Sequence, residues 1–405
     1  MTIESRNVRS LYWDVALWGV TNGIAGTFTA VFALRLGATD QQIGLLSALP
    51  ALVYVLWFIP AGRLVESRKS IKATGLAGNF FFRLQYLVVA ALPFFPPASR
   101  IPLLLAGIML AGIPLCVANV AITNVIADVV PPASRPRVVS TRNILMSLTT
   151  AVAASVAGKL LDLLPMPGNY QVIFLGAFIF GMLSLFALSR LVVPDVQPAG
   201  AFSLRPRLFV RQIAEMLAVV RLTPDFLRFT LAAFVLHWGL VFAWPLFSLW
   251  WVNGLKASEG LIGLVATVNM LAIITANPFW ARVAERRGNR FCLLVGFAGV
   301  TFVPLINALV PKAEYILLTE LLAGLIVPAM SLGLFNVMLE VSPAERRPTY
   351  IAVYSAAVNI PMFLAPILAT TVAAPLLGVR LSLALCTPLR LVAWVVVFAL
   401  LRQRA

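Results

Sequence analysis

One segment occurs twice in this chain, as Leu36-Gly-Ala-Thr-Asp-Gln-Gln-Ile-Gly-Leu45 and again as Leu255-Lys-Ala-Ser-Glu-Gly-Leu-Ile-Gly-Leu264. The copies are 219 residues apart, and in each a hydroxyl residue, Thr39 or Ser258, precedes an acid and an apolar run. This order predicts a helix N-terminus, because the hydroxyl caps free N–H groups and the acid faces the positive end of the helix dipole.

A second pair of segments matches in the same order along the chain. Asn124-Val-x-x-Asp128-Val-x-Pro131 corresponds to Asn336-Val-x-x-Glu340-Val-x-Pro343, at an offset of 212 residues. Two matches in one order indicate that the two halves of the chain are copies of one unit.

The composition places this repeat in a membrane. Of 405 residues, 61% are apolar and 11% charged, whereas soluble domains have about 45–50% and about 25%. The excess apolar surface must face lipid, and a bilayer core about 30 Å thick needs roughly 20 apolar residues per helix. Twelve runs are long enough, near 11–34, 42–62, 73–95, 101–130, 138–163, 170–193, 226–252, 260–281, 291–310, 314–341, 349–376 and 380–401.

Because these runs are continuous and not alternating, they predict helices, not barrel strands. We therefore expect an all-α integral membrane protein, built from six-helix bundles over 1–195 and 225–405. The polar stretch 196–224 predicts a linker with an amphipathic helix on the membrane surface. Six helices return the chain to its starting side, so the bundles are parallel repeats.

The distribution of Lys and Arg predicts the orientation. Of the 31 basic residues, 23 fall in segments on one side of the predicted membrane, and each of the six opposite loops carries one. This bias predicts cytosolic termini in a multi-pass protein of the cell membrane, inner or plasma. It also argues against a nucleic-acid partner for the net charge of +16, because the charge lines one membrane face.

No pattern of residues predicts chemistry on a covalent bond. The three cysteines, Cys116, Cys292 and Cys386, lie far apart inside apolar runs and predict neither disulfides nor a metal site. We find no metal-binding cluster, phosphate-binding Gly-rich loop or nucleophile–base pair in the sequence. We therefore expect no cofactor, no metal and no enzyme activity.

The loops after the second and eighth runs contain related basic motifs, Gly62-Arg-Leu-Val-Glu-Ser-Arg-Lys69 and Ala281-Arg-Val-Ala-Glu-Arg-Arg-Gly-Asn-Arg290. They resemble the G-x-L-a-D-r-x-G-r-r signature of the major facilitator superfamily, with Glu66 and Glu285 in place of the usual Asp. The resemblance implies two six-helix bundles around a central cavity, rocking to open it to each side in turn, and function as a monomer. Two features that accompany proton antiport in many members of this family are missing here. The fourth helix, 103–130, has no arginine, and the segment 149–158 of the fifth helix has no proline. Both departures weigh against proton antiport.

Polar and aromatic residues on the helices that this resemblance assigns to the cavity are substrate candidates: Trp18, Asn22, Asn119, Asn124, His237, Trp244, Glu320 and Asn336. His237, the only histidine, could carry a proton, or could be a neutral side chain bonded to a neighbouring helix. Offset 219 places Trp18 at the position equivalent to His237. Each asparagine could bind substrate or connect helices.

Other ionisable residues within the spans have two interpretations each. We expect Glu320 and Arg390 to form a structural ion pair, with ion coupling by Glu320 as the alternative. We expect Arg83 to form a hydrogen bond with another helix of its own bundle. We expect Asp14 to lie near the N-terminus of the first helix, where the helix dipole stabilises its charge. The alternative is that its protonation is coupled to transport.

The resemblance also implies a gate at the cytosolic ends of the second and eighth helices. Glu66 would face the N-terminus of the eleventh helix, and Glu285 that of the fifth. The residues of this expected gate are Gly62, Arg63, Glu66, Arg282, Glu285, Arg286, Arg135 and Arg346.

These patterns together predict a secondary active transporter of a small organic, partly apolar solute. We expect membrane lipids as surroundings, protons as a candidate coupling ion and efflux as the direction. Two alternatives stay open: a lipid or uncoupled solute transporter of the same fold, and a membrane assembly factor or receptor that transports nothing.

Overall fold

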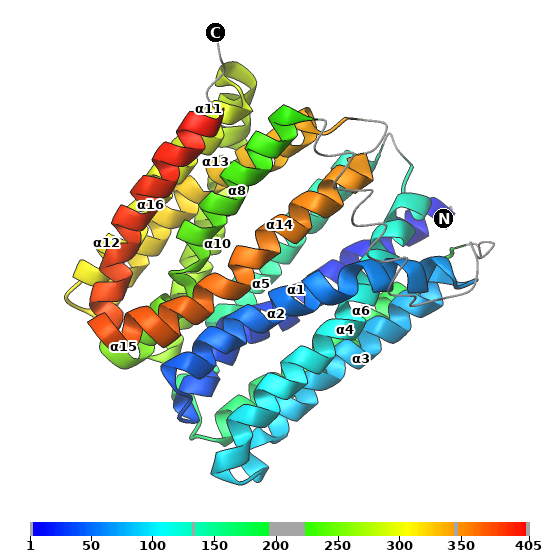
Figure 1. Cartoon of the computed structure of the whole chain (residues 1–405). Coiled ribbons are helices and arrows are strands. Elements are labelled where there is room, and N and C mark those ends of the chain that lie inside the picture. The colour runs from blue at the N-terminus through cyan, green and yellow to red at the C-terminus, as the bar shows by residue number, and fades with distance from the viewer. Residues whose placement is uncertain (1–2, 132–133, 194–222, 344–346, 402–405) are drawn as a thin grey trace. The chain divides into compact units, whose positions relative to one another are not determined.

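The protein is described by a computed structural model, which covers residues 3–131, 134–193, 223–343 and 347–401 (Figure 1). These residues form helices, and 12 of the helical stretches are long and apolar enough to cross a membrane. The first six spans are α1 (Ile3–Arg35), α2 (Asp40–Glu66), α3 (Ile71–Ala91) with η1 (Leu92–Phe94), α4 (Pro97–Val129), α5 (Arg135–Leu163) and α6 (Gly168–Ser189).

The second six spans include interrupted helices. Span seven comprises α8 (Pro224–Val241), α9 (Trp244–Leu249) and η2 (Trp250–Gly254). Span nine comprises α11 (Asn289–Thr301) and α12 (Val303–Leu309). The others are α10 (Glu259–Arg287), α13 (Ile316–Val341) preceded by η3 (Ala313–Tyr315), α14 (Arg347–Leu368) with η5 (Ala369–Ala373) and α15 (Ala374–Leu377), and α16 (Val379–Leu401).

Proline accounts for two of these interruptions. Pro245 and Pro304 follow the breaks after α8 and α11. Neither has an N–H to bond the carbonyl four residues earlier, so the helical ladder is interrupted one turn before each proline.

The predicted helix caps of the repeated segment are confirmed. Thr39 Oγ1 accepts a hydrogen bond from the N–H of Gln42 at 3.3 Å, and Ser258 Oγ accepts from Leu261 at 3.2 Å. The Gln42 side chain also accepts from the N–H of Thr39 at 2.9 Å, which completes a reciprocal cap in the first copy.

The helices group into two compact units. Unit 1 comprises 1–38, 53–203 and 258–270, and unit 2 comprises 39–52, 204–257 and 271–405. The first part of α10 therefore packs in unit 1, and the first part of α2 packs in unit 2. Most of the predicted linker, 194–222, lies outside the described residues, so its amphipathic helix stays a prediction.

Small residues allow close helix packing within unit 1. A Cβ at Gly23 would lie 2.5 Å from the carbonyl oxygen of Thr150 on α5, and one at Gly78 would lie 2.7 Å from that of Pro114 on α4. Thr150 Oγ1 donates to the Gly19 carbonyl at 3.0 Å. The pairs α1–α5 and α3–α4 thus pack backbone against backbone, and Figure 1 shows α3 beside α4.

In unit 2, α11 and α13 approach in the same way, through Gly296 and Gly333. A hydrophobic core containing Phe229, Phe297 and Val397 joins α8, α11 and α16. All three cysteines are buried free thiols.

Candidate functional site

Asp14 of α1 is a buried carboxylate inside unit 1. The prediction that Asp14 follows the start of its helix closely was wrong, because α1 begins at Ile3 and not near residue 11. The polar residues Glu4, Arg6 and Asn7 belong to the helix, so the apolar run understates its length. Asp14 lies eleven residues into α1, about 17 Å along its axis, and only 5% of it is exposed.

Three neighbouring helices surround this carboxylate with polar groups. Arg142 of α5 places Nη2 3.4 Å from Asp14 Oδ2. Ser184 of α6 donates its hydroxyl to Oδ1 at 2.7 Å. The same hydroxyl accepts a hydrogen bond from Arg83 Nη2 of α3 at 2.9 Å. A continuous chain of polar contacts therefore joins α3, α6, α1 and α5 within unit 1.

Arg83 is the most deeply buried cation of this cluster. Its exposed fraction is 1%, and its guanidinium carbon lies 5.2 Å from the centre of the Trp18 ring. Gly181 of α6 leaves room for its stem, since a Cβ there would lie 3.2 Å from Arg83 Cδ. Arg83 Nε and Nη1 and Arg142 Nε are buried without a partner among the described residues.

The charges of the cluster do not balance. Two guanidinium groups surround one carboxylate, so the carboxylate is the only anion that offsets either cation within these contacts. Removing one partner of a buried ion pair costs about 3–5 kcal/mol, because the remaining charge is left in a medium of low dielectric constant. A change in the charge of Asp14 would therefore change how strongly α1, α5 and α6 hold together.

The contacts of Arg142 and Ser184 with Asp14, and the burial of Asp14, were missed by sequence reasoning. One more arginine near the basic side of a span, such as Arg142, does not stand out in the sequence, and a serine in an apolar run carries no signal of its own. The predicted intrabundle hydrogen bond of Arg83 is confirmed by its contact with Ser184.

A polar stripe runs along the second half of α4. Asn119, Thr123 and Asn124 are exposed there, and Asn119 donates a hydrogen bond to the hydroxyl of Tyr54 on α2. Offset 212 carries Asn119 onto Ser331, which is exposed on α13, and Asn124 onto Asn336. Both copies of the repeat thus expose a polar side chain at this level of the equivalent helix.

The remaining aromatic and histidine candidates lie in different surroundings. Trp18 packs against α3, with its ring 5.8 Å from that of Phe82. His237 is half-buried, and its Nδ1 lies 2.7 Å from the carbonyl oxygen of Ala233 on its own helix. Trp244 is half exposed at the start of α9, and Asn22 is half-buried on α1. Trp18 and His237 belong to different units, so a cavity shared by them stays a prediction.

Arg390 is held by main-chain carbonyls. It donates from Nε to Gly239 at 2.8 Å, from Nη1 to Val300 at 2.7 Å and from Nη2 to Leu240 at 3.0 Å. The partial negative charges of these three carbonyls stabilise the guanidinium. Glu320 is half-buried on α13, and its predicted pairing with Arg390 stays a prediction.

Asn336 connects two helices of unit 2. Its Nδ2 donates to Asn289 Oδ1 of α11 at 2.9 Å, and Asn289 Nδ2 donates to Glu340 Oε1 at 2.5 Å. Of the two interpretations of Asn336, the helix connection has a contact to support it.

The predicted gate residues lie at helix ends. Glu66 is the exposed last residue of α2, with Gly62 and Arg63 one turn earlier. Arg282, Glu285 and Arg286 are exposed near the end of α10. Arg135 begins α5, but its side chain and the whole of Arg346 lie outside what the structure describes. The gate stays a prediction.

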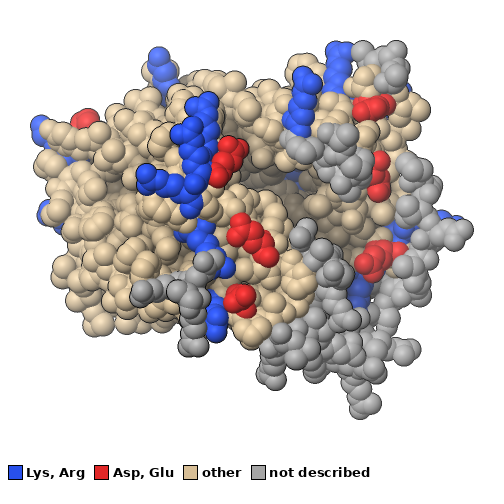
Figure 2. All heavy atoms as spheres, turned by 90° about the horizontal axis from the view of Figure 1, so that it is seen from above, with Lys and Arg blue, Asp and Glu red and all other residues tan. Residues whose placement is uncertain are grey.

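Figure 2 shows Lys, Arg, Asp and Glu side chains gathered on the face seen from above Figure 1.

A second polar cluster in unit 1 surrounds the start of α10. Glu259 Oε1 lies 2.7 Å from Arg35 Nε of α1 and accepts a hydrogen bond from the Tyr170 hydroxyl of α6 at 2.9 Å. Asp162 of α5 accepts from the N–H of Gly260 at 3.0 Å. Sequence reasoning gave Glu259 only a role at its helix N-terminus, because partners far along the chain leave no local pattern.

The twelve spans and the internal repeat define an integral membrane protein with a duplicated architecture. The sequence model of the Major Facilitator Superfamily matches the chain twice, over residues 15–244 and 229–405. The chain belongs to the Major Facilitator Superfamily and is a multi-pass membrane transporter. No curated protein matches it in sequence.

Solved structures share the fold at low sequence identity. A POT family transporter in complex with 5-aminolevulinic acid superposes with a TM-score of 0.73 and 14% identity, covering 98% of this chain and 95% of that one. The nucleoside transporter NupG, as a D323A mutant, gives 0.73 and 11%, covering 99% and 100%. A bacterial homolog of the human lysosomal transporter Spinster gives 0.69 and 15%, covering 99% and 97%.

Proposed function

We propose that this protein is a secondary active transporter that exports a small organic, partly apolar solute in exchange for protons, with Asp14 as the proton-carrying group. The observation that carries the proposal is the contact of buried Asp14 with Arg142 and Ser184. A carboxylate at membrane depth is costly, and such groups are typically retained for a function.

The arrangement explains how a proton could be coupled to a movement of helices. With Asp14 ionised, its contacts hold α1 to α5 and α6. Protonation removes the charge that balances Arg142, so this ion pair weakens and the contact between α1 and α5 becomes less stable at this position. A proton can thereby shift the balance between two arrangements of the helices, which is what coupling requires.

The exposed polar residues of α4 and α13 support a water-accessible solute pathway. Asn119, Thr123 and Asn124 would be poorly placed against lipid, where no water satisfies an amide. With neighbouring aromatic groups such as Tyr54, they would suit a solute with both polar and apolar parts. Of the related structures, one is described as a nucleoside transporter and another as a transporter in complex with 5-aminolevulinic acid, and both ligands are small organic molecules.

The test measures proton movement in proteoliposomes that contain the purified chain and a trapped pH-sensitive dye. Solutes are first selected from a library by their stabilisation of the folded protein against heat. Addition of a selected solute on one side should change the internal pH, in protein-containing liposomes only. Solute flux without a pH change would indicate an uncoupled transporter, and absence of flux for every stabilising solute would contradict transport.

A further inference from the structure

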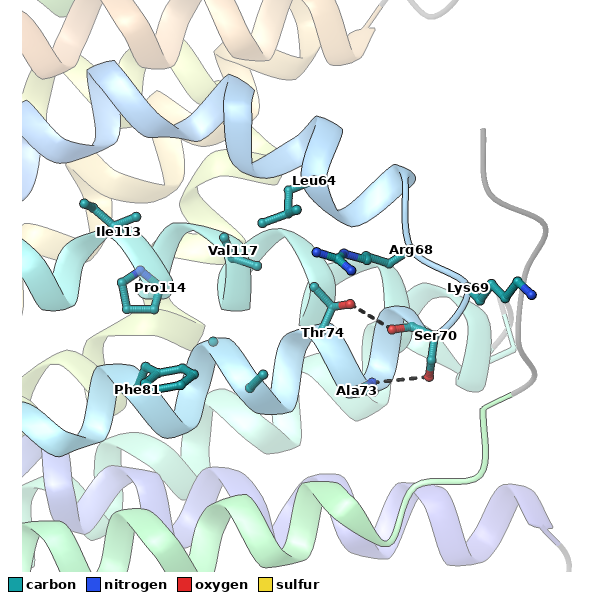
Figure 3. A pocket seen from close by; sticks show the side chains of 12 residues that line it. Leu64, Arg68, Lys69, Ser70, Ala73, Thr74, Phe81, Ile113, Pro114 and Val117 are labelled. Carbon is teal, nitrogen blue, oxygen red and sulfur yellow. Dashed lines mark hydrogen bonds between the residues drawn. The ribbon is translucent and has the colours of Figure 1, made fainter. Parts of the chain in front are cut away.

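A pocket in unit 1 lies between the end of α2, the first half of α3 and the middle of α4 (Figure 3). Its volume is about 580 Å³, within the usual range of about 300–1,000 Å³ for small-molecule sites. It is separate from the Asp14 cluster, because none of that cluster's side chains lines it.

The pocket has a basic end and an apolar length. Arg68 and Lys69 lie at its loop end, whereas Phe81, Ile113 and Val117 line it further along. Figure 3 shows Arg68 extending over the pocket toward Thr74, while Lys69 points away from the helices. None of the 12 residues drawn around it is acidic, and among the described residues neither basic side chain has an ion-pair partner.

Small residues keep the apolar length open. Ala73 and Ala77 are exposed on the side of α3 that faces the pocket. Gly78 brings α3 against α4, since a Cβ there would lie 2.7 Å from the Pro114 carbonyl oxygen. From Ser70 to Phe81 the groove follows α3 for about 16 Å, close to the thickness of one leaflet of hydrocarbon, about 15 Å.

We propose that this pocket binds one anionic phospholipid, with its phosphate at Arg68 and an acyl chain along α3 and α4. The unpaired guanidinium supplies the charge that a phosphate needs. The groove continues into a membrane-spanning pair of helices whose outer surface is apolar, as the exposed Phe80 and Phe81 show. A free phosphate ion would leave the apolar length empty, which favours a lipid as the occupant.

The test uses native mass spectrometry of the full-length chain, purified in mixed micelles of phosphatidylglycerol and phosphatidylcholine. The wild type should retain one phosphatidylglycerol in preference to phosphatidylcholine. One basic residue at an anionic lipid surface corresponds to about a fivefold change in binding, so Arg68→Gln should lower retention by about that factor. Ala77→Leu, an exposed change that fills the groove, should lower it without loss of folding.

The matched control is Arg287→Gln. Offset 219 places Arg287 opposite Arg68 in the repeat, and its guanidinium carbon lies 5.1 Å from the centre of the Phe291 ring. Retention should be unchanged in this variant. Equal losses in both arginine variants, or full retention after Ala77→Leu, would overturn the proposal. Competition by glycerol phosphate at the same concentration as the lipid would assign the site to a free phosphate and also overturn it.

Discussion

Arg35 Nε lies 2.7 Å from Oε1 of Glu259, although 224 residues separate the two in the chain. The contact holds the start of α10 to α1, and Tyr170 joins α6 to the same carboxylate. One acid from the second copy of the repeat thus connects three helices of unit 1. Asp40 stands at the equivalent position of the first copy. Glu259 is therefore also the acid of the helix N-terminus that the repeat predicted.

We expect Arg35 and Glu259 to be coupled energetically, but modestly. The side chains are 31% and 14% exposed, so solvent screens their attraction. A double-mutant cycle with Arg35→Gln and Glu259→Gln, followed by thermal unfolding in detergent, should give a coupling of about 0.5–1 kcal/mol. Strictly additive losses would show that the contact contributes nothing to stability.

Two glycines of the repeated segment permit equivalent close contacts. A Cβ at Gly263 would overlap the Ala154 carbonyl oxygen on α5, and one at Gly44 would lie 2.8 Å from that of Pro366 on α14. The acceptors Ala154 and Pro366 are themselves 212 residues apart. The repeat therefore preserves a backbone contact as well as a sequence.

Replacing Gly263 with valine should push α10 away from α5. Ser155 Oγ and Thr267 Oγ1 lie 2.7 Å apart on these helices, so cysteines at both positions should form a disulfide readily. We expect Gly263→Val to lower the yield of this disulfide sharply. Gly176→Val is the control, because a Cβ there meets nothing within 4 Å. Equal yields in all three backgrounds would contradict the close contact.

Replacing Arg390 should destabilise unit 2 more than replacing Arg380. Arg390→Gln leaves up to three buried carbonyls without their donor, and each unsatisfied group costs about 1–3 kcal/mol. The exposed Arg380 donates from Nε to the Ala308 carbonyl, so its loss leaves one acceptor without its donor. Adding Glu320→Gln tests the predicted ion pair, because a paired Glu320 makes the two losses non-additive. Thermal unfolding is measured for Arg390→Gln, Arg380→Gln, Glu320→Gln and the double variant of Arg390 and Glu320.

The orientation can be tested at two loops predicted to face outward. Lys256 and Lys312 are the only basic residues of their loops, and the bias of Lys and Arg predicts that both loops lie outside the cell. Cysteines at these positions should react with an impermeant thiol reagent in intact cells. Reaction at position 69 instead would reverse the orientation.

Features that repeat or persist along the chain could be predicted from sequence. The twelve apolar runs place the spans, and the caps at Thr39 and Ser258 follow from local order. Boundaries were less accurate where polar residues continue a helix, as at the start of α1, and this error misplaced Asp14. Composition cannot distinguish a polar residue outside a membrane-spanning helix from one inside its first turns.

The partners of the buried charges could not be predicted. Arg142 and Ser184 reach Asp14 from positions 128 and 170 residues away, and only the packing of α1 against α5 and α6 brings them together. Helix rotation about its axis, which decides which neighbour a side chain meets, has no signature in a uniformly apolar run.

The central claim is that Asp14 carries the proton coupled to transport, and the Asp14→Asn variant tests it most directly. Asparagine keeps the size of the side chain and a carbonyl oxygen for Ser184, but cannot gain or lose a proton. A solute that stabilises the protein is added outside proteoliposomes with an acidic interior. Outward proton flow should drive its accumulation with the wild type and with the exposed control Asp225→Asn. With Asp14→Asn, gradient-driven accumulation should vanish while exchange of labelled for unlabelled solute continues. Gradient-driven accumulation at the wild-type rate in Asp14→Asn would contradict the account.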